Sequence, residues 1–324
     1  MAPLYCPFIR VINFGPVGNK VVRECYKIKP SPPRSRVFDE PVAGQNTGGW
    51  ICQSAFQRAV ENRIPKRNIM NQEIVNEMGR ATFTPADARE KEVRVDLAAM
   101  FRLTHMMGWD DTIWNHITAR VPGTDHHFLM HRFGLLYEEV TASNLIKVDE
   151  NGNVLEGPPD INTAGFIIHS AIHLNHPNNK FVFHAHPPSA LAATAFKEGI
   201  PYWVQDSSML YGKVGYHPWE GLSVDMEERF RIAGNLGENK VLVMQNHGFL
   251  TVGETAGEAF MNMYYTIRMC EVAVQAQSAG VPLEPATKDL WELSCRQYES
   301  FSPGRYEWPA LKRRCDRLDP SYKI

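Results

Sequence analysis

The stretch FVFHAHPP, residues 181–188, carries the strongest functional signal in this sequence. Side chains alternate across a β-strand, so His184 and His186 project from the same face, about 7 Å apart along it. Two imidazoles in this arrangement can bind one metal ion, and the two prolines that follow end the strand where ligands can reach the pair. Paired histidines also occur on solvated strands, so a metal site needs a third ligand.

A third histidine follows another apolar strand further along the chain. His247 stands in the sequence QNHG, residues 245–248, directly after VLVM at 241–244. The glycine allows the backbone to turn sharply and to present the ring. Three imidazoles leave coordination positions open, as in catalytic sites, and they suit Zn²⁺ best, although Fe²⁺, Co²⁺ or Mn²⁺ also fit. We therefore predict a divalent metal at His184, His186 and His247.

Helix and strand patterns alternate along most of the chain around these histidines. Hairpin signals occur among the strands, which predicts a mixed or antiparallel sheet with helices covering its faces. The predicted helices are 84–108, 162–176, 189–197, 225–234 and 255–278, and the predicted strands are 112–121, 127–131, 145–148, 181–186, 240–245 and 249–252.

The composition is that of an ordinary globular protein. The 324-residue chain is 44% hydrophobic and 22% charged. Its net charge of −2 gives no overall field that would attract nucleic acid or an anionic membrane. No apolar run approaches the length of about 18 residues that a membrane span needs. The six cysteines lack CxxC spacing, so we expect reduced thiols and a cytoplasmic location.

The sequence divides into an N-terminal extension over 1–83, a domain over 84–282, and a tail over 283–324 that we expect to pack on the domain or on a neighbour. Residues 1–36 contain seven Lys or Arg and a single acid, Glu24. Such a start is compatible with a mitochondrial transit peptide. Its prolines disfavour the amphipathic helix that a transit peptide needs, which favours an extended basic arm.

Seven short motifs occur in a specific order between residues 96 and 281. They are NHIT (115–118), FGLLY (133–137), VTAS (140–143), AGF (164–166), HSAI (169–172), HAH (184–186) and NHG (246–248). Together they resemble the class II aldolase/adducin family. The resemblance implies an α/β fold of three layers, α/β/α, around a mostly antiparallel sheet, with the three predicted histidines as metal ligands. It also implies a homotetramer with active sites between neighbouring subunits.

One position departs from the sugar-phosphate aldolases of that family. Those enzymes carry a carboxylate four residues before the helix histidine that here is His169, where it contacts the metal and acts as an acid or base. This chain has Gly165 at that position, which can do neither. The departure places the chain nearer to the adducin-like branch.

The family's phosphate pocket is matched only in part. Asn115, Gly134 and Thr163 persist and are our candidates for substrate binding, but Phe133 and Ala164 stand where hydroxyl residues are usual. We therefore expect a substrate that is not a sugar phosphate.

Other polar residues have two interpretations each. The segment 211–220 is dense in polar and aromatic groups, so His217 or Glu220 could supply the proton transfer and Tyr216 could stabilise an oxyanion. Ordinary loop packing is the alternative. His169 and His173 share one helix face, but we expect them, without a nearby acid in the motif, to be partly buried or surface histidines. His116 is expected either to line the pocket or to face inward.

These observations favour a metal-dependent lyase that catalyses aldol cleavage, dehydration or decarboxylation of a small hydroxy-carbonyl or carboxylate compound. A second hypothesis is an Fe²⁺ oxygenase that uses the same three histidines. A third is an adducin-like assembly module without catalysis, which would bind cytoskeletal partners. After residues 311–314, a short basic cluster, no lysine-rich tail like that of adducin is visible, which favours the enzyme.

Overall fold

The computed structural model describes residues 88–124 and 126–324. The predicted extension over 1–83, with its expected basic arm, lies outside the described residues. So does the predicted helix start at Thr84.

The centre of the domain is one sheet of eight strands. The strands are β1 (His116–Arg120), β2 (His127–His131), β3 (Leu145–Asp149), β4 (Val154–Glu156), β5 (Phe181–Ala185), β6 (Val214–His217), β7 (Val241–Met244) and β8 (Gly248–Gly253). Their order across the sheet is β4-β3-β2-β1-β5-β8-β7-β6. Every neighbouring pair is antiparallel except β6 and β7, which are parallel. The predicted α/β fold with a mostly antiparallel sheet is confirmed.

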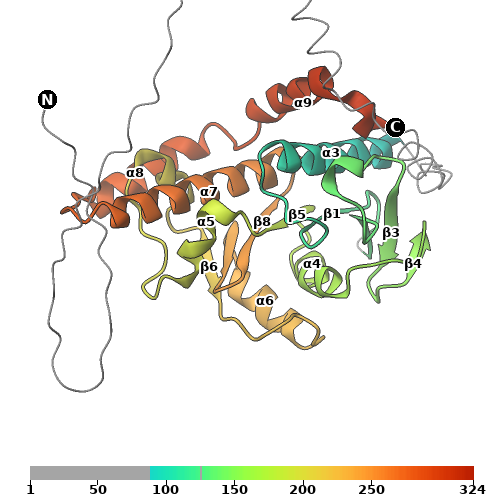
Figure 1. Ribbon diagram of the computed structural model, residues 1–324, viewed down its shortest axis with the longest axis horizontal. Coiled ribbons are helices and arrows are strands. Elements are labelled where there is room, and N and C mark those ends of the chain that lie inside the picture. Colours follow the sequence, from blue (N-terminus) through green and yellow to red (C-terminus); the bar gives the residue numbers. More distant parts are fainter. Residues whose placement is uncertain (1–87, 125) are drawn as a thin grey trace, which may run out of the picture. The chain divides into compact units, whose positions relative to one another are not determined.

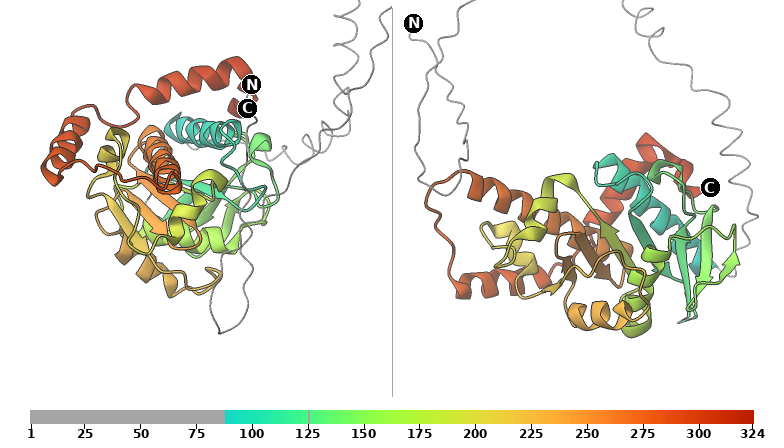
Figure 2. Two further views of the ribbon diagram at one scale, coloured as in Figure 1. Left: turned by 60° about the vertical axis from the view of Figure 1, so that its left-hand side comes forward. Right: turned by 60° about the horizontal axis from the view of Figure 1, so that its bottom comes forward.

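Helices cover both faces of this sheet (Figure 1). The α-helices of the described residues are α3 (Ala88–Met106), α4 (Thr163–Asn175), α5 (Pro188–Leu191), α6 (Glu228–Leu236), α7 (Ala256–Ser278), α8 (Lys288–Glu299) and α9 (Glu307–Leu318). Both views of Figure 2 keep α3, coloured teal, and α6, coloured light orange, on opposite sides of the strands. The domain therefore has three layers, with α3 and α7 on one face of the sheet and α4 and α6 on the other.

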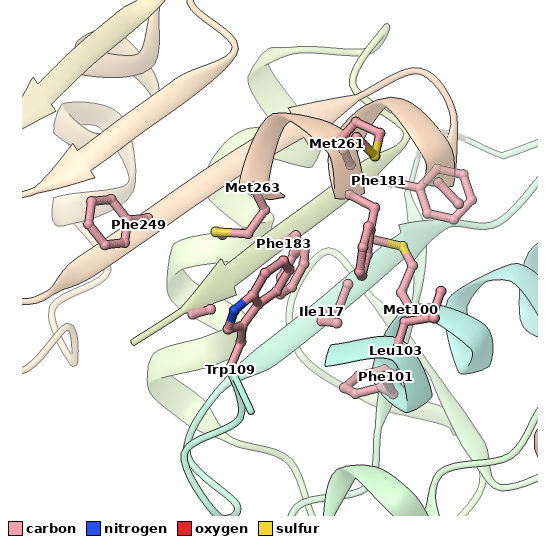
Figure 3. Packing of buried hydrophobic residues seen from close by; sticks show 14 of the residues in the cluster. Met100, Phe101, Leu103, Trp109, Ile117, Phe181, Phe183, Phe249, Met261 and Met263 are labelled. Carbon is pink, nitrogen blue, oxygen red and sulfur yellow. The ribbon is translucent and has the colours of Figure 1, made fainter. Parts of the chain in front are cut away.

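The alternation of side chains along β5 determines what each face buries. Phe181 and Phe183 point into the larger core with Trp109 and Met263 (Figure 3). Val182 belongs to the second core, beneath α4 and α6. His184 shares the face of Val182, because strand residues two apart point the same way. The first metal-ligand candidate is therefore buried between the sheet and α4, and none of its side chain is exposed.

Side-chain caps fix the starts of two helices. The side chain of Asn162 accepts a hydrogen bond from the backbone N–H of Gly165 at 3.0 Å, which fixes the start of α4. Thr255 accepts one from the N–H of Glu258 at 3.1 Å and caps α7 in the same way. The strands of the predicted hairpin pair as β1 and β2, although β1 begins only at His116.

Two local predictions are wrong, and one short strand was not predicted. The helix predicted over 189–197 breaks into α5 and a 3-10 turn over Ala192–Ala195. The segment 211–220, expected to be a loop, contains β6. The short strand β4 has too little apolar alternation to be recognised in the sequence.

Residues 283–324 form α8, α9 and a final 3-10 turn, Pro320–Lys323. The Trp308 side chain lies so close to Gly257 that a side chain there would meet the Trp308 Cβ at 2.7 Å. Tyr322 is fully buried, and its carbonyl accepts a hydrogen bond from the Ala142 N–H at 2.8 Å. This part of the chain therefore packs on the domain of its own subunit.

Within the described residues, no helix has the length and apolar character that crossing a membrane requires. The described cysteines, Cys270, Cys295 and Cys315, are buried free thiols.

A histidine buried in the larger core makes a prediction about acid stability. His131 lies against Phe101, with ring centroids 5.0 Å apart, and neither ring nitrogen has a hydrogen-bond partner among the described residues. Burial lowers the pKa of His131 to about 4. An unfolded histidine titrates near pH 6.5, so the unfolded chain binds this proton first, and stability falls as the pH drops from about 6.5 towards 4.

We predict that His131→Phe reduces the fall in the free energy of unfolding by up to about 1.4 kcal/mol per pH unit. The substitution keeps an aromatic ring in the core but removes the group that titrates. Urea unfolding between about pH 7.5 and pH 5, with a chelator present, measures the slope. Met130→Leu on the same strand is the control and should shift stability equally at every pH. Equal slopes for wild type and His131→Phe would contradict the prediction.

Candidate metal centre

Three histidines meet at the end of β5. His184 is the fourth residue of that strand, and His186 is the first residue after the strand ends. His247 lies in the turn between β7 and β8. The centroids of the three rings are 4.7 to 4.9 Å apart. Their ligand nitrogens lie within 4.8 Å of one another, and Nε2 of His184 is 2.8 Å from Nε2 of His186. The predicted ligands therefore converge on one point.

The turn that carries His247 is unusually tight. Asn246 has φ +56°, a left-handed conformation that asparagine tolerates better than most residues. Gly248 is needed for a different reason: a Cβ there would lie 2.6 Å from Cδ2 of His186 and 2.8 Å from the carbonyl oxygen of Ala185. The sequence predicted a glycine that turns the backbone, whereas in the structure Gly248 allows the two strands and the His186 ring to approach each other.

The electrostatics of the cluster favour the form of histidine that binds metals. Burial lowers the pKa of His184 well below its usual value, and the neighbouring His186 lowers it further. Burial, again with His186 second, lowers the pKa of His247 to about 4. Both rings are therefore neutral at neutral pH, with a nitrogen lone pair available for a cation. Three imidazoles aimed at one point fit a divalent transition metal.

Asp111 is a further candidate for the site that no sequence motif indicates. Its Oδ2 is 3.1 Å from Nδ1 of His186, so Nε2 of that ring is the nitrogen turned to the cluster. A carboxylate behind a ligand histidine fixes the ring and its tautomer and raises its basicity. Asn115 adds a second restraint, because its Oδ1 accepts a 3.5 Å hydrogen bond from the backbone N–H of His186.

A pocket of about 470 Å³ opens beside the cluster. Its described lining is Asp110, Asp111, His186, Pro188, Leu191, Trp219, Asn246 and His247. The described lining therefore combines apolar side chains with two carboxylates, and it includes neither Lys nor Arg. Trp219 is 62% exposed at the rim, where a bound molecule could cover it.

The three predicted catalytic residues lie outside this lining. His217 is buried, with Nε2 3.3 Å from Oε1 of Glu228 and Nδ1 2.9 Å from Nδ2 of Asn235. The Tyr216 hydroxyl accepts a hydrogen bond from the Ile200 N–H at 2.9 Å. Glu220 forms an exposed ion pair with Arg231 at 2.6 Å, and this partner lowers the pKa of Glu220. Each side chain is thus engaged elsewhere, and its catalytic role stays a prediction.

The predicted substrate-binding residues also lie outside the described pocket lining. Asn115 is fully buried and supports His186 from behind. Gly134 is exposed at φ +100°, and Thr163 is the exposed first residue of α4. None of the three belongs to the described lining of the pocket.

Comparison with known proteins agrees with this architecture. Residues 95–274 match the family described as Class II Aldolase and Adducin N-terminal domain. The chain belongs to this family. Among its relatives, a Caulobacter vibrioides protein named "Putative aldolase class 2 protein" is 40% identical over 237 residues, which cover 72% of this chain and 92% of that protein.

Two further proteins resemble this chain, one an adducin and the other named as an aldolase. Alpha-adducin of Rattus norvegicus is 37% identical over 262 residues, which cover 75% of this chain but only 36% of that protein. The structure of an L-fuculose 1-phosphate aldolase from Glaciozyma antarctica superposes with a TM-score of 0.67 at 27% identity, covering 78% of this chain and 99% of that one. The family thus includes enzymes as well as adducins.

The position of Asp111 makes a prediction about metal affinity. We expect Asp111→Asn to weaken Zn²⁺ binding about 10–100-fold, the usual cost of losing a residue that supports a ligand histidine. Asp110→Asn is the matched control, because the carboxylate of Asp110 is hydrogen-bonded to His105, at 2.8 Å, and not to His186. This variant should keep a dissociation constant near that of wild type. Competition with a chromophoric chelator measures both, on protein purified without a metal-binding tag. Replacing His184 and His186 together by Ala should abolish binding, and a retained ion in that variant would place the ligands elsewhere.

Proposed function

We propose that the protein is a divalent-metal-dependent lyase, with Zn²⁺ as the preferred ion, that acts on a small, uncharged hydroxy-carbonyl compound. The convergence of three imidazoles beside an open pocket carries the proposal. Membership in a family that includes aldolases supports it. A divalent ion at these histidines would supply a Lewis acid for polarising a carbonyl group.

Residues of the chain would hold the ion, transfer a proton and exclude water. His184, His186 and His247 hold the ion, and Asp111 orients His186. Asp110 lies on the pocket wall, where its carboxylate, which is hydrogen-bonded to His105 at 2.8 Å, can take up or deliver a proton. Pro188, Leu191 and Trp219 form the apolar side that would exclude water from a bound substrate.

The charge of the lining favours an uncharged substrate. The described lining has no Lys or Arg to bind a phosphate or carboxylate group away from the ion, and Asp110 and Asp111 add negative charge there. The solved aldolase compared above is named for a phosphorylated sugar, L-fuculose 1-phosphate. We infer that this chain differs from it in substrate, in line with the Gly165 departure.

A pair of variants separates two candidates for the proton-transferring group. Asp110→Asn should lower kcat by roughly 10²–10⁴-fold, the usual effect of losing a general acid or base, with metal content unchanged. His217→Ala tests the candidate from the sequence. Turnover is measured by reducing the released aldehyde in a coupled assay, with short hydroxyketones presented beside their phosphorylated counterparts. Loss of turnover only in His217→Ala would return the role to His217, and preference for the phosphorylated compounds would overturn the proposed substrate class.

An adducin-like assembly role is the second candidate, because alpha-adducin is 37% identical to this chain over the matched region. A protein that binds metal, turns over none of these compounds and cosediments with spectrin and actin filaments would favour it over the lyase.

We also propose a homotetramer. Support comes from exposed apolar side chains on the segment that leads from the pocket rim at Trp219 into α6: Leu222 is 84% exposed, Val224 65% and Phe230 62%. Large apolar patches of this kind mark interaction surfaces. Sedimentation at micromolar concentration should find tetramers, and Leu222→Asp combined with Phe230→Asp should shift the protein towards smaller species. Wild-type protein that sediments only as a monomer would contradict the proposal.

A further inference from the structure

His116 lies directly behind the metal-ligand candidate His184. The two residues are opposite each other in the antiparallel pairing of β1 with β5. Their rings are stacked, with centroids 4.7 Å apart and planes inclined by 22°. Both side chains are almost completely buried, so no solvent separates them. The ring of His116 therefore limits the positions that the ring of His184 can adopt.

The other side of the His116 ring contacts helix α4 at Gly165. A Cβ at Gly165 would lie 2.6 Å from Cδ2, 2.9 Å from Cγ and 3.1 Å from Nε2 of His116. The cap formed by Asn162 holds this first turn of α4 in place, because its side chain accepts the Gly165 N–H. The imidazole thus fills the space in which a side chain at position 165 would begin.

Hydrogen bonds fix the orientation of His116 in this gap. Its Nδ1 shares a hydrogen bond with Nε2 of His169 at 2.8 Å. Nδ1 of His169 is bonded to the Thr118 hydroxyl at 2.6 Å, and that hydroxyl to Nε2 of His173 at 2.8 Å. Two helix histidines and a strand threonine therefore hold a ring that is not itself part of the described pocket lining.

We propose that His116 is a positioning residue of the metal centre, which orients His184, and that position 165 is glycine so that the His116 ring can lie there. The inference rests on the proposed metal site. It explains why position 165 has no side chain: the space is filled by the imidazole of His116, which comes from β1.

Gly165→Ala tests the inference without altering any ligand. The added methyl group must displace the His116 ring, so we expect Zn²⁺ affinity to fall about 10–100-fold. His116→Ala should weaken binding by a similar factor. The two changes act through the same ring, so Gly165→Ala should cause no further loss of Zn²⁺ affinity in a chain that already carries His116→Ala. A double-mutant cycle measures this coupling.

Gly234→Ala is the matched control, because Gly234 is an exposed glycine in α6 and a Cβ added there would meet nothing within 4 Å. It should leave the affinity unchanged. The absorption spectrum of the Co²⁺-loaded full chain is a second readout, since it reports ligand geometry and should change in Gly165→Ala. If His116→Ala does not fold, His116→Val, which suits a strand, completes the same cycle.

Three outcomes would overturn the inference: wild-type affinity and spectrum in Gly165→Ala, an equal further loss from Gly165→Ala in the His116→Ala background, or an equal loss in Gly234→Ala. In each of them wild-type protein still binds Zn²⁺, so the proposed metal site survives. A wild-type chain that binds no divalent metal would instead overturn both proposals.

Discussion

The pairing of β5 with β1 on one side and β8 on the other is the constraint on which the metal centre depends. This register places His184 opposite His116 and Leu250, between the sheet and α4. It also brings the start of β8, and with it His247, to the end of β5. A slip of one residue would turn His184 into the aromatic core on the other face. The site is therefore a product of strand register more than of any single loop.

Burial of so many imidazoles is tolerated because they stay neutral, and His116, His169 and His173 are joined by hydrogen bonds through Thr118. Burial lowers the pKa of His169 to about 3, and it lowers the pKa values of His116 and His173 well below the usual range. Neutral rings act as both donor and acceptor, which allows the chain of hydrogen bonds through Thr118. The same desolvation that makes a charged ring costly keeps the lone pairs of the cluster available for a cation.

The sequence predicted the parts of the site that depend on local patterns. Strand alternation and the strand-end turn were sufficient to single out three histidines that converge in the structure, and to expect a mixed or antiparallel sheet. Asp111 could not be found in this way, because its contact with His186 joins two residues that are 75 positions apart in the sequence. The absence of a carboxylate at Gly165 was visible, but the ring that fills the gap comes from a strand that precedes α4 by several elements. The hydrogen bond from the Ile200 N–H to the Tyr216 hydroxyl could not be predicted either, because it depends on how the chain between them folds.

The three candidate ligands lie in two segments that are about 60 positions apart in the chain. An ion that joins them would act as a reversible cross-link, closing a long loop that the unfolded chain would otherwise sample freely. Folding and ion binding are then linked, and each tenfold rise in free ion above its dissociation constant adds about 1.4 kcal/mol to the folded state. The amount of intact protein in a cell would in this way follow the supply of the metal.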